Sequence, residues 1–373
     1  MIVLGAGAAG LAAGALLARR GLPVTVVEAR DRPGGRVDTY RDRALGLALE
    51  RGAEFVHGRP ARTLALARRA RAPLRAIPYR HQLRRGDRLL DGGAAFAEAE
   101  RTLALGRRDG EPFDQVLRRA PSAARRADVA ALARGFVRGF YLADPRTASA
   151  RALARMTEGM EEIEGDALSR VEGGYARVLE PLLADLRRGG AEVRLSTAAE
   201  VVRWRRGGVR VEARGPTGAR LAPLSGRGLV VTVPPSLVAR DAPRFAPALP
   251  EKRAAARALP MGPIVKVVLR FRRPPWNGRR RRGLVFLHLP GAAVPVFWTT
   301  SPLPSPVLVG WAGGPDGARL GARGRKGALA AAVAAAARGL GRTPRALEDL
   351  LDGAEVVDWS RDPLARGGYA TFP

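Results

Sequence analysis

The sequence predicts an α/β fold built on a doubly wound, Rossmann-like domain. Three observations predict it: a short apolar run at residues 2–5, a glycine-rich turn that leads into helical spacing at 11–18, and a second apolar run at 24–27. Short apolar runs bounded by turns are typical of buried strands, and apolar residues three and four positions apart are typical of a helix. A strand, a glycine turn, a helix and a strand in this order indicate the first βαβ unit of a nucleotide-binding sheet.

The glycine turn fits the pattern G-x-G-x-x-G, and its motif positions are Gly5, Gly7, Ala8, Ala9 and Gly10. In this motif the first glycine permits a tight turn, the second lets the backbone approach a pyrophosphate, and the third lets the helix pack closely on the strand. The N-terminus of the helix supplies N–H groups and a partial positive charge to the phosphates. A glycine-rich βαβ unit without a ligand is the structural alternative.

A second glycine turn indicates which dinucleotide to expect. Glu28 and the adjoining Ala29 end the second strand, where a carboxylate accepts hydrogen bonds from a ribose, and the chain then reaches Gly34, Gly35 and Arg36. A nicotinamide-binding domain does not need this second turn, whereas a guanidinium placed on it can clamp the pyrophosphate through a planar, bidentate contact. The combination resembles the flavin-containing amine oxidase family, which includes monoamine, polyamine and L-amino-acid oxidases. The resemblance implies that the cofactor is FAD.

Further segments resemble the same family along most of the chain. The segment from Gly52 to Gly58, which includes Ala53, Glu54 and Phe55, resembles the one that passes beside the flavin and lines the substrate cavity. Residues 171–175 resemble the return from the substrate domain to the FAD domain, and residues 229–235 resemble a strand that leaves the second FAD segment. Val201 matches a valine whose backbone meets the adenine in the family.

The resemblance also implies a domain organisation. We expect a discontinuous FAD-binding domain at residues 1–60, 169–240 and 352–373. An α+β substrate-binding domain is then inserted in two pieces, at residues 61–168 and 241–351. The first piece is mainly helical in its pattern, and the second mixes strands and helices.

Composition narrows the classes of function. The 373 residues include 64 basic and 35 acidic side chains, a net charge of +29, but only three of the basic residues are lysine and 61 are arginine. The arginines are spread along the chain, so we interpret the charge as a compositional bias and expect no nucleic-acid partner, although phosphate neutralisation by basic residues leaves that alternative open. With no cysteine and three histidines, we expect no metal site. No apolar segment is long enough to span a membrane, and we expect a cytoplasmic protein.

Lys266 lies in an apolar strand pattern from Ile264 to Phe271. A lysine whose side chain escapes to solvent is the ordinary interpretation. In a chain with so few lysines, however, a lysine in a buried strand indicates that arginine cannot replace it there. Lysine is a compact donor whose pKa can fall on burial, whereas a guanidinium always stays charged. In the family, the matching lysine holds a water against the flavin N5.

Two further residues are candidates for the substrate site. His57 lies inside the flavin-adjacent segment, where polyamine-oxidising relatives carry an acidic residue or a histidine that faces the substrate nitrogen. Its structural alternative is an ordinary loop or core histidine. Tyr369 resembles one wall of the aromatic cage that holds the amine nitrogen, and packing near the chain end is its structural alternative. In relatives that bond FAD covalently a cysteine precedes this tyrosine. Here that residue is Gly368, so we expect non-covalent FAD.

The hypothesis from the sequence is an FAD-dependent amine oxidase. The amine binds in its neutral form, hydride passes to flavin N5, and dioxygen is the acceptor, which gives hydrogen peroxide and an imine that hydrolyses to an aldehyde. Family members continue for several dozen residues beyond the position of Pro373, so we expect the C-terminal FAD-binding segment to be missing. A related FAD desaturase, a protoporphyrinogen-type oxidase and a truncated, non-catalytic member of the family are the alternatives. The particular amine and the oligomeric state stay open.

Overall fold

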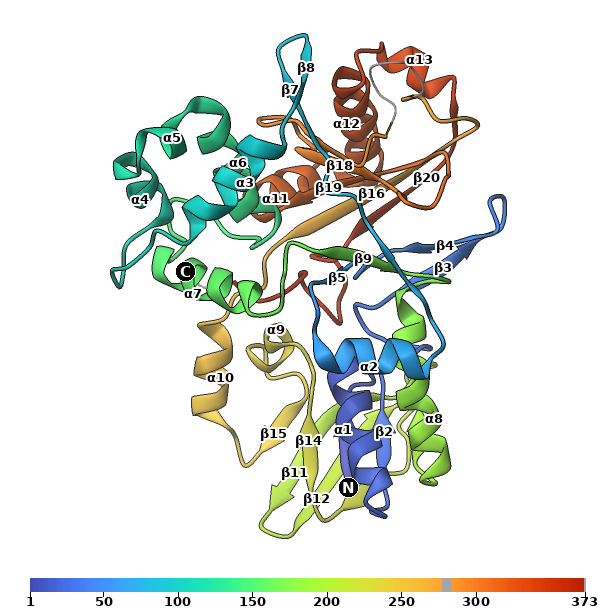
Figure 1. Ribbon diagram of the computed structural model, residues 1–373. Helices are drawn as coiled ribbons and strands as arrows, with labels where there is room; N and C mark the ends of the chain where they lie inside the picture. The colour runs from blue at the N-terminus through green and yellow to red at the C-terminus, as the bar shows by residue number, and fades with distance from the viewer. Residues whose placement is uncertain (277–282, 372–373) are drawn as a thin grey trace.

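The computed structural model describes residues 1–276 and 283–371, which form two lobes (Figure 1). In the lower lobe of Figure 1 lies a parallel sheet of four strands, in the order β10 (Glu192–Arg194), β2 (Thr25–Val27), β1 (Ile2–Leu4) and β14 (Leu229–Val231). Val3 pairs with Val26 on one side and with Val230 on the other. The central strand is buried because neighbouring strands and packed layers cover it, which accounts for its unbroken apolar run.

Helices cover one face of this sheet. α1 (Ala8–Arg19) follows the glycine turn and packs beside α8 (Glu180–Arg188). On the opposite side, Ile2, Leu4 and Val27 pack against an antiparallel sheet rather than against helices. That sheet contains β13 (Leu224–Gly226), β12 (Gly208–Arg214), β11 (Ala198–Arg205) and β15 (Arg244–Ala246).

The prediction of a doubly wound sheet is therefore correct for one face only. The second face is covered by strands because residues 202–205 and 209–214 alternate apolar and charged side chains with a period of two. Their apolar set includes Val202, Val209 and Val211, and these three side chains are buried against the parallel sheet.

The upper lobe is built on a seven-stranded mixed sheet. Its order is β20 (Leu351–Asp358), β16 (Ile264–Phe271), β19 (Val307–Gly313), β18 (Val296–Thr299), β17 (Phe286–His288), β7 (His81–Arg85) and β8 (Arg88–Asp91). β17 and β7 pair in parallel, although about 200 residues separate them. β20 pairs with β16 along its whole length, so this sheet extends across the boundary predicted between residues 351 and 352.

Helices cover the upper sheet. One group, shown in dark red in Figure 1, consists of α11 (Gly314–Ala322), α12 (Gly324–Gly339) and α13 (Pro344–Glu348). A second group lies to the left and consists of α3 (Gly93–Leu103), α4 (Phe113–Arg119), α5 (Ser122–Arg125), α6 (Ala127–Gly139) and α7 (Ala150–Glu161). Among the described residues, no helix combines the length and the apolarity that crossing a membrane requires.

Short strands and helices lie between the lobes and around the lower sheet. The strands are β3 (Thr39–Asp42) paired with β4 (Leu47–Glu50), and β5 (Val56–His57) in one sheet with β9 (Leu168–Val171) and β6 (Leu74–Ala76). The helices are α2 (Ala61–Arg69), the 3-10 turn η1 (Tyr175–Leu179), α9 (Pro235–Val238) and α10 (Pro250–Arg257). β9 brings the chain back from the helical group to the lower lobe, and it passes beside the segment that follows β4.

Candidate active site

A cavity of about 910 Å³ joins the two lobes. Its walls include both glycine turns of the lower lobe, the segment at 52–55, strand β16 of the upper sheet and aromatic side chains of the helical group. The cavity therefore brings together the residues that the sequence predicts for a nucleotide and those that it predicts for a substrate.

The first glycine turn has no room for side chains at two of its positions. A Cβ on Gly10 would lie 1.8 Å from the carbonyl oxygen of Gly5, and Gly5 itself has φ of +97°. At Gly7, in contrast, no atom lies within 4 Å of the position that a Cβ would take, and the residue lines the cavity. This backbone is open exactly where a pyrophosphate would approach the start of α1, together with the cavity-lining Ala8 and Ala9.

Glu28 lies at the carboxyl end of β2, buried in the cavity wall. Its Oε2 accepts a hydrogen bond from the Ala6 amide at 2.7 Å, and its Oε1 accepts one from the Arg30 amide at 2.9 Å. Each carboxylate oxygen has a second lone pair, so both can accept a further hydrogen bond from a ribose. Ala29 lines the same wall.

The second glycine turn, at Gly34 and Gly35, is held in place by an arginine that precedes it. Arg32 donates to the Gly35 carbonyl at 3.0 Å and forms an ion pair with Asp38 at 2.8 Å. Arg36, half-buried on the cavity wall, donates through Nη1 to the carbonyl of Gly368. One of the five N–H donors of Arg36 thus binds residue 368 next to the turn, and Arg36 lines the same cavity as the start of α1.

Val201 does not line the cavity. It lies in β11, where it pairs with Glu212 and with Arg244. Instead, Thr197 and Ala198 line this part of the wall, together with Thr232. They follow the carboxyl ends of β10 and β14, and ligands of parallel α/β sheets bind at that edge. Applied to the segments of β10 and β14, this rule is the signal that would have found them.

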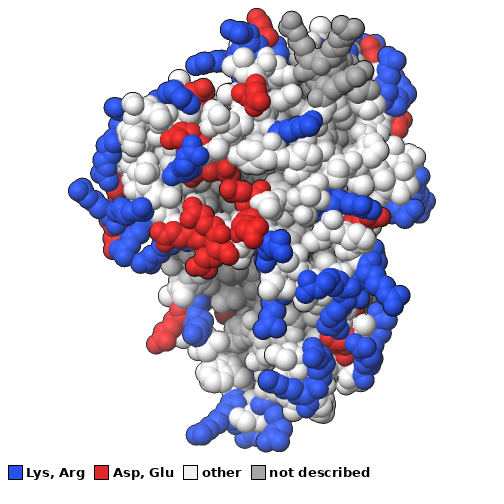
Figure 2. Space-filling view, in the orientation of Figure 1, with Lys and Arg blue, Asp and Glu red and all other residues white. Residues whose placement is uncertain are grey.

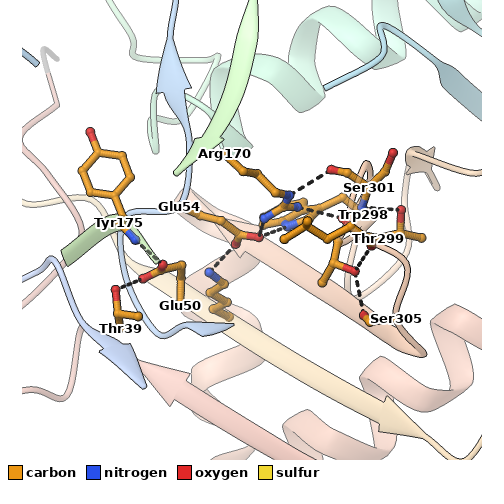
Figure 3. A network of polar contacts seen from close by, with 12 residues as sticks. Thr39, Glu50, Glu54, Arg170, Tyr175, Trp298, Thr299, Ser301 and Ser305 are labelled. Atoms are coloured by element: carbon orange, nitrogen blue, oxygen red, sulfur yellow. Dashed lines mark hydrogen bonds and ion pairs between the residues drawn. The ribbon is translucent and has the colours of Figure 1, made fainter. Parts of the chain in front are cut away.

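A buried charged network occupies the junction of the two lobes (Figure 3). Lys266, which is 0% exposed, donates through Nζ to Oε2 of Glu54 at 2.5 Å and to the carbonyl of Gly52 at 3.3 Å. Oε1 of Glu54 accepts from Nη1 of Arg170 at 2.5 Å and from Nε1 of Trp298 at 2.9 Å. The four side chains come from β16, the segment after β4, β9 and β18.

The pKa values of two carboxylates in this region, Glu54 and Glu50, are shifted in opposite directions. Burial alone would raise the pKa of Glu54, but the charges of Lys266 and Arg170 and their hydrogen bonds lower it to about 2. Burial raises the pKa of Glu50 to about 6, although hydrogen bonds from the Thr39 hydroxyl and the Tyr175 amide act against this shift. Glu54 is therefore a permanent anion at neutral pH, and it faces the buried lysine.

His57 and Phe55 line the cavity beside this network. The ring of His57 lies 5.3 Å from that of Phe140 and 6.2 Å from that of Phe55, both edge-on. Burial lowers the pKa of His57 to about 4, so the imidazole is neutral at neutral pH. A neutral imidazole can accept a hydrogen bond from an amine, but it does not repel a cation.

Tyr369 also lines the cavity, and its hydroxyl donates to the carbonyl of Phe140. The backbone around it is fixed, because Gly262 donates to the Tyr369 carbonyl at 2.9 Å and Gly368 donates to the Gly262 carbonyl at 3.0 Å. The wall near it is aromatic, with Trp298 and Trp311 at 5.7 Å between ring centroids. The structure thus brings Lys266, His57 and Tyr369, the three predicted catalytic residues, to one cavity.

Sequence reasoning missed the far end of the cavity. His81 and His288 lie there with their ring nitrogens 2.9 Å apart, and the His81 ring stacks on Phe96 at 3.9 Å. All three histidines of the chain therefore line the same cavity. Their rarity among so many arginines is the signal that could have selected them.

Acidic side chains form one wall at this far end. Glu100 and Asp166 line the cavity, and the pKa of Glu100 is raised to about 7 by burial and by the neighbouring Asp166. Four more carboxylates are exposed on the same segment as Asp166, namely Glu158, Glu161, Glu162 and Glu164. Figure 2 shows acidic side chains gathered on the face where α7 lies in Figure 1. We call these six residues the acidic wall, and residues 156–166 contain no lysine or arginine.

The sequence is similar to a known protein family and to several of its characterised members. A model of the family described as flavin containing amine oxidoreductase matches residues 8–121 and 71–373. Lysine-specific histone demethylase 1B of Mus musculus is 27% identical over 321 residues, which cover 79% of this chain and 37% of that protein. Polyamine oxidase 4 of Oryza sativa subsp. japonica is 45% identical over 58 residues, or 16% of this chain and 12% of that protein. The matched part is thus little more than a third of the length of the histone demethylase.

Solved structures share the fold. Wild-type putrescine oxidase bound to putrescine aligns with a TM-score of 0.74 and 23% identity, covering 99% of this chain and 86% of that one. Cyclohexylamine oxidase from Brevibacterium oxydans IH-35A aligns with a TM-score of 0.75 and 21% identity, covering 100% and 88% of the two chains.

Proposed function

The chain belongs to the flavin-containing amine oxidoreductase family, and on that premise we propose that it is an FAD-dependent enzyme that oxidises a carbon–nitrogen bond of an amine. The observation that carries the proposal is the single cavity that joins the glycine turns to Lys266, His57 and Tyr369. A nucleotide site and an aromatic substrate site that open into one another are what transfer between a cofactor and a small molecule requires.

The residues of this chain fit FAD. The crowded Gly5 and Gly10 shape the turn, and the open face of Gly7 leaves room for the pyrophosphate. Glu28 has lone pairs for a ribose, and Arg36 has N–H groups for a phosphate. The chain contains no cysteine, so a thioether link to the flavin is impossible and FAD is held without covalent attachment.

When bound, FAD would accept a hydride from the α-carbon of the neutral amine, which leaves an iminium that water hydrolyses to an aldehyde and ammonia or a shorter amine, and dioxygen as final acceptor would take up the two electrons to give hydrogen peroxide. The protein residues prepare the amine for this step. The aromatic wall at Trp298, Trp311 and Tyr369 excludes water and favours the neutral form of the amine. The neutral imidazole of His57 accepts a hydrogen bond from the amine N–H and orients it.

The acidic wall points to an amine that reaches the enzyme as a cation. Two of its six carboxylates, Glu100 and Asp166, line the far end of the cavity, and the other four are exposed on the same segment as Asp166, in a chain whose net charge is +29. A patch of one sign at a cavity attracts ions of the opposite sign and raises their local concentration. We therefore expect a protonated amine to enter past this wall and to lose its proton inside the apolar part of the cavity.

The test is a single-turnover experiment on the FAD-loaded chain. Under anaerobic conditions, mixing with an amine should bleach the visible flavin band, and admission of air should restore it with formation of hydrogen peroxide. A panel of mono-, di- and polyamines, together with amino acids, polyenes and a porphyrinogen, identifies the substrate class. Bleaching by the polyene or the porphyrinogen alone would overturn the proposal in favour of a desaturase or protoporphyrinogen-type oxidase, and a chain that binds FAD but is bleached by none of them would be non-catalytic.

A further inference from the structure

Glu54 is an unusual neighbour for Lys266, because it puts a fully buried carboxylate against a fully buried ammonium at the junction of the two lobes. The Glu54 side chain is 7% exposed and that of Lys266 is 1% exposed. Their contact joins the segment that follows β4 to strand β16 of the upper sheet, on the wall of the cavity (Figure 3).

We propose that Glu54 is the positioning residue for Lys266, and that Arg170 and Trp298 in turn hold Glu54 in place. The inference rests on the proposed function, because it assigns Lys266 a task at the flavin side of the cavity. Glu54 acts through Lys266 and has no task of its own with the substrate.

The hydrogen bonds of Lys266 define what it can still do. An ammonium has three N–H donors. One donates to Glu54 at 2.5 Å and one to the Gly52 carbonyl at 3.3 Å. A single N–H therefore stays available to the cavity, and its direction is set by the two bonds that Glu54 and Gly52 accept.

Glu54 cannot turn away from Lys266, because its other oxygen is held twice. Arg170 and the indole N–H of Trp298 both donate to Oε1. Arg170 itself donates to the carbonyls of Thr299 at 2.8 Å, at the end of β18, and of Ser301 at 3.0 Å, just after it. The position of Lys266 is thus set by the loop after β18 and by β9, two parts of the chain outside the nucleotide turns.

The charges in this network balance. Lys266 and Arg170 are the cations, Glu54 is the anion between them, and Glu50 on β4 is the second carboxyl whose charge acts on Lys266. Removing the charge of Glu54 alone leaves two buried cations that face each other without an anion between them. Lys266 then loses the ion pair and the stronger of the two hydrogen bonds that orient its ammonium group.

The experiment is a double-variant cycle on flavin reduction. We expect Glu54→Gln to slow flavin reduction by the amine about tenfold, the size that follows from losing a hydrogen bond to a charged group, with little change in KM. Glu54→Asp, which keeps the charge, should recover part of the rate. In a chain that already carries Lys266→Met, Glu54→Gln should change the rate by less than about twofold, because the residue through which it acts is gone.

The matched control is Asp185→Asn. Asp185 is also a buried carboxylate that accepts hydrogen bonds from two arginines, Arg69 at 2.7 Å and Arg188, but it lies in α8 and does not line the cavity. A general effect of removing a buried anion would slow flavin reduction in both variants, whereas a positioning role slows it only at Glu54.

A second measurement does not depend on the stability of any variant or on activity. The chain has only three lysines, so a protein labelled with ¹³C and ¹⁵N in lysine gives three sets of side-chain NMR signals, and Lys252→Arg and Lys326→Arg, both at exposed positions, assign the Lys266 set by elimination. In the unsubstituted, FAD-loaded chain, a positioned Lys266 should show two inequivalent ε-protons and high order, whereas Lys252 and Lys326 should be averaged by motion.

The outcomes separate the inference from the function on which it rests. A chain that is never bleached by an amine contradicts the proposed function. A chain that is bleached normally, but in which Glu54→Gln leaves flavin reduction unchanged, or slows it equally with and without Lys266, contradicts the role of Glu54. Averaged ε-protons at Lys266 would contradict it as well.

Discussion

Lys266 is the residue on which the account depends most. Sequence reasoning selected it because lysine is so rare in this chain, and the structure places it, fully buried, on the cavity wall. The residues that hold its partner Glu54 were not predictable. Arg170 and Trp298 lie 96 residues before and 32 residues after Lys266 in the sequence, and no local pattern marks them as neighbours.

Replacing this lysine should affect the chemistry more than binding. We expect Lys266→Met to slow flavin reduction or reoxidation by about 10- to 100-fold, which is the effect of losing one hydrogen bond from a charged group. Stopped-flow measurement of each half-reaction checks this. Lys252→Met, at an exposed position in α10, is the control that should leave both half-reactions unchanged. Equal half-reactions in the Lys266→Met and unsubstituted proteins would contradict a flavin-side task for the residue.

The second residue with a measurable signature is Glu100, whose pKa is raised to about 7 by burial and by Asp166. Its carboxyl is neutral below this pH and negative above it. We therefore expect KM for a cationic amine to fall as pH rises through about 7. Glu100→Gln should remove this part of the profile. Dividing the KM of the unsubstituted protein by that of Glu100→Gln at each pH removes the effect of the ionisation of the amine itself. A ratio that stays flat from pH 5 to 9 would show that Glu100 does not contact the substrate.

At the scale of elements, local patterns predicted the βαβ unit well because each of its parts is local. The strands at 2–4 and 25–27 and the helix that starts at Ala8 lie where apolar runs and glycine spacing place them. The seven-stranded sheet was not predictable in the same way. It pairs β7 with β17, and such a long-range parallel pairing leaves no periodic trace in the sequence.

Two glycines of the first turn should respond in opposite ways to an added methyl group. Gly10→Ala would push a Cβ to 1.8 Å from the Gly5 carbonyl, so we expect a loss of about 1–3 kcal/mol in the free energy of unfolding. Gly7→Ala meets no protein atom within 4 Å, and its free energy of unfolding should stay within about 0.5 kcal/mol.

The Gly7 methyl group would instead occupy the side of the turn that faces the cavity. We expect Gly7→Ala to weaken FAD binding at least about tenfold, because the backbone can no longer approach the pyrophosphate closely. Denaturant unfolding of the cofactor-free chain and titration with FAD measure the two effects separately. Unchanged FAD affinity in Gly7→Ala would mean that the pyrophosphate binds elsewhere.

At the scale of the whole molecule, the sequence predicted a strongly basic chain but not how its charge is distributed. Five of the six residues of the acidic wall lie close together in the sequence, on the segment that ends α7, and the fold brings Glu100 of α3 near Asp166 of that segment in the cavity wall. The arginines surround them on other faces, several of them in ion pairs across the surface. A chain with a net charge of +29 can therefore still attract a cation to its cavity.

This distribution predicts an unusual salt dependence. We expect kcat/KM for a cationic amine to fall as ionic strength rises, because screening weakens the attraction by the acidic wall. The double variant Glu161→Gln and Glu162→Gln, at exposed positions outside the cavity lining, should lower kcat/KM at low salt and flatten its salt dependence. A rise of kcat/KM with salt would show that the basic faces dominate the approach of the substrate.

The central claim is that one cavity holds an amine against a flavin bound by the glycine turns. The most direct measurement is anaerobic stopped-flow absorbance of the FAD-loaded chain mixed with increasing amine. The account predicts a flavin-reduction rate that saturates with amine concentration and that Lys266→Met lowers. A folded chain that binds FAD, yet keeps its flavin oxidised at every concentration of every amine, would contradict the account.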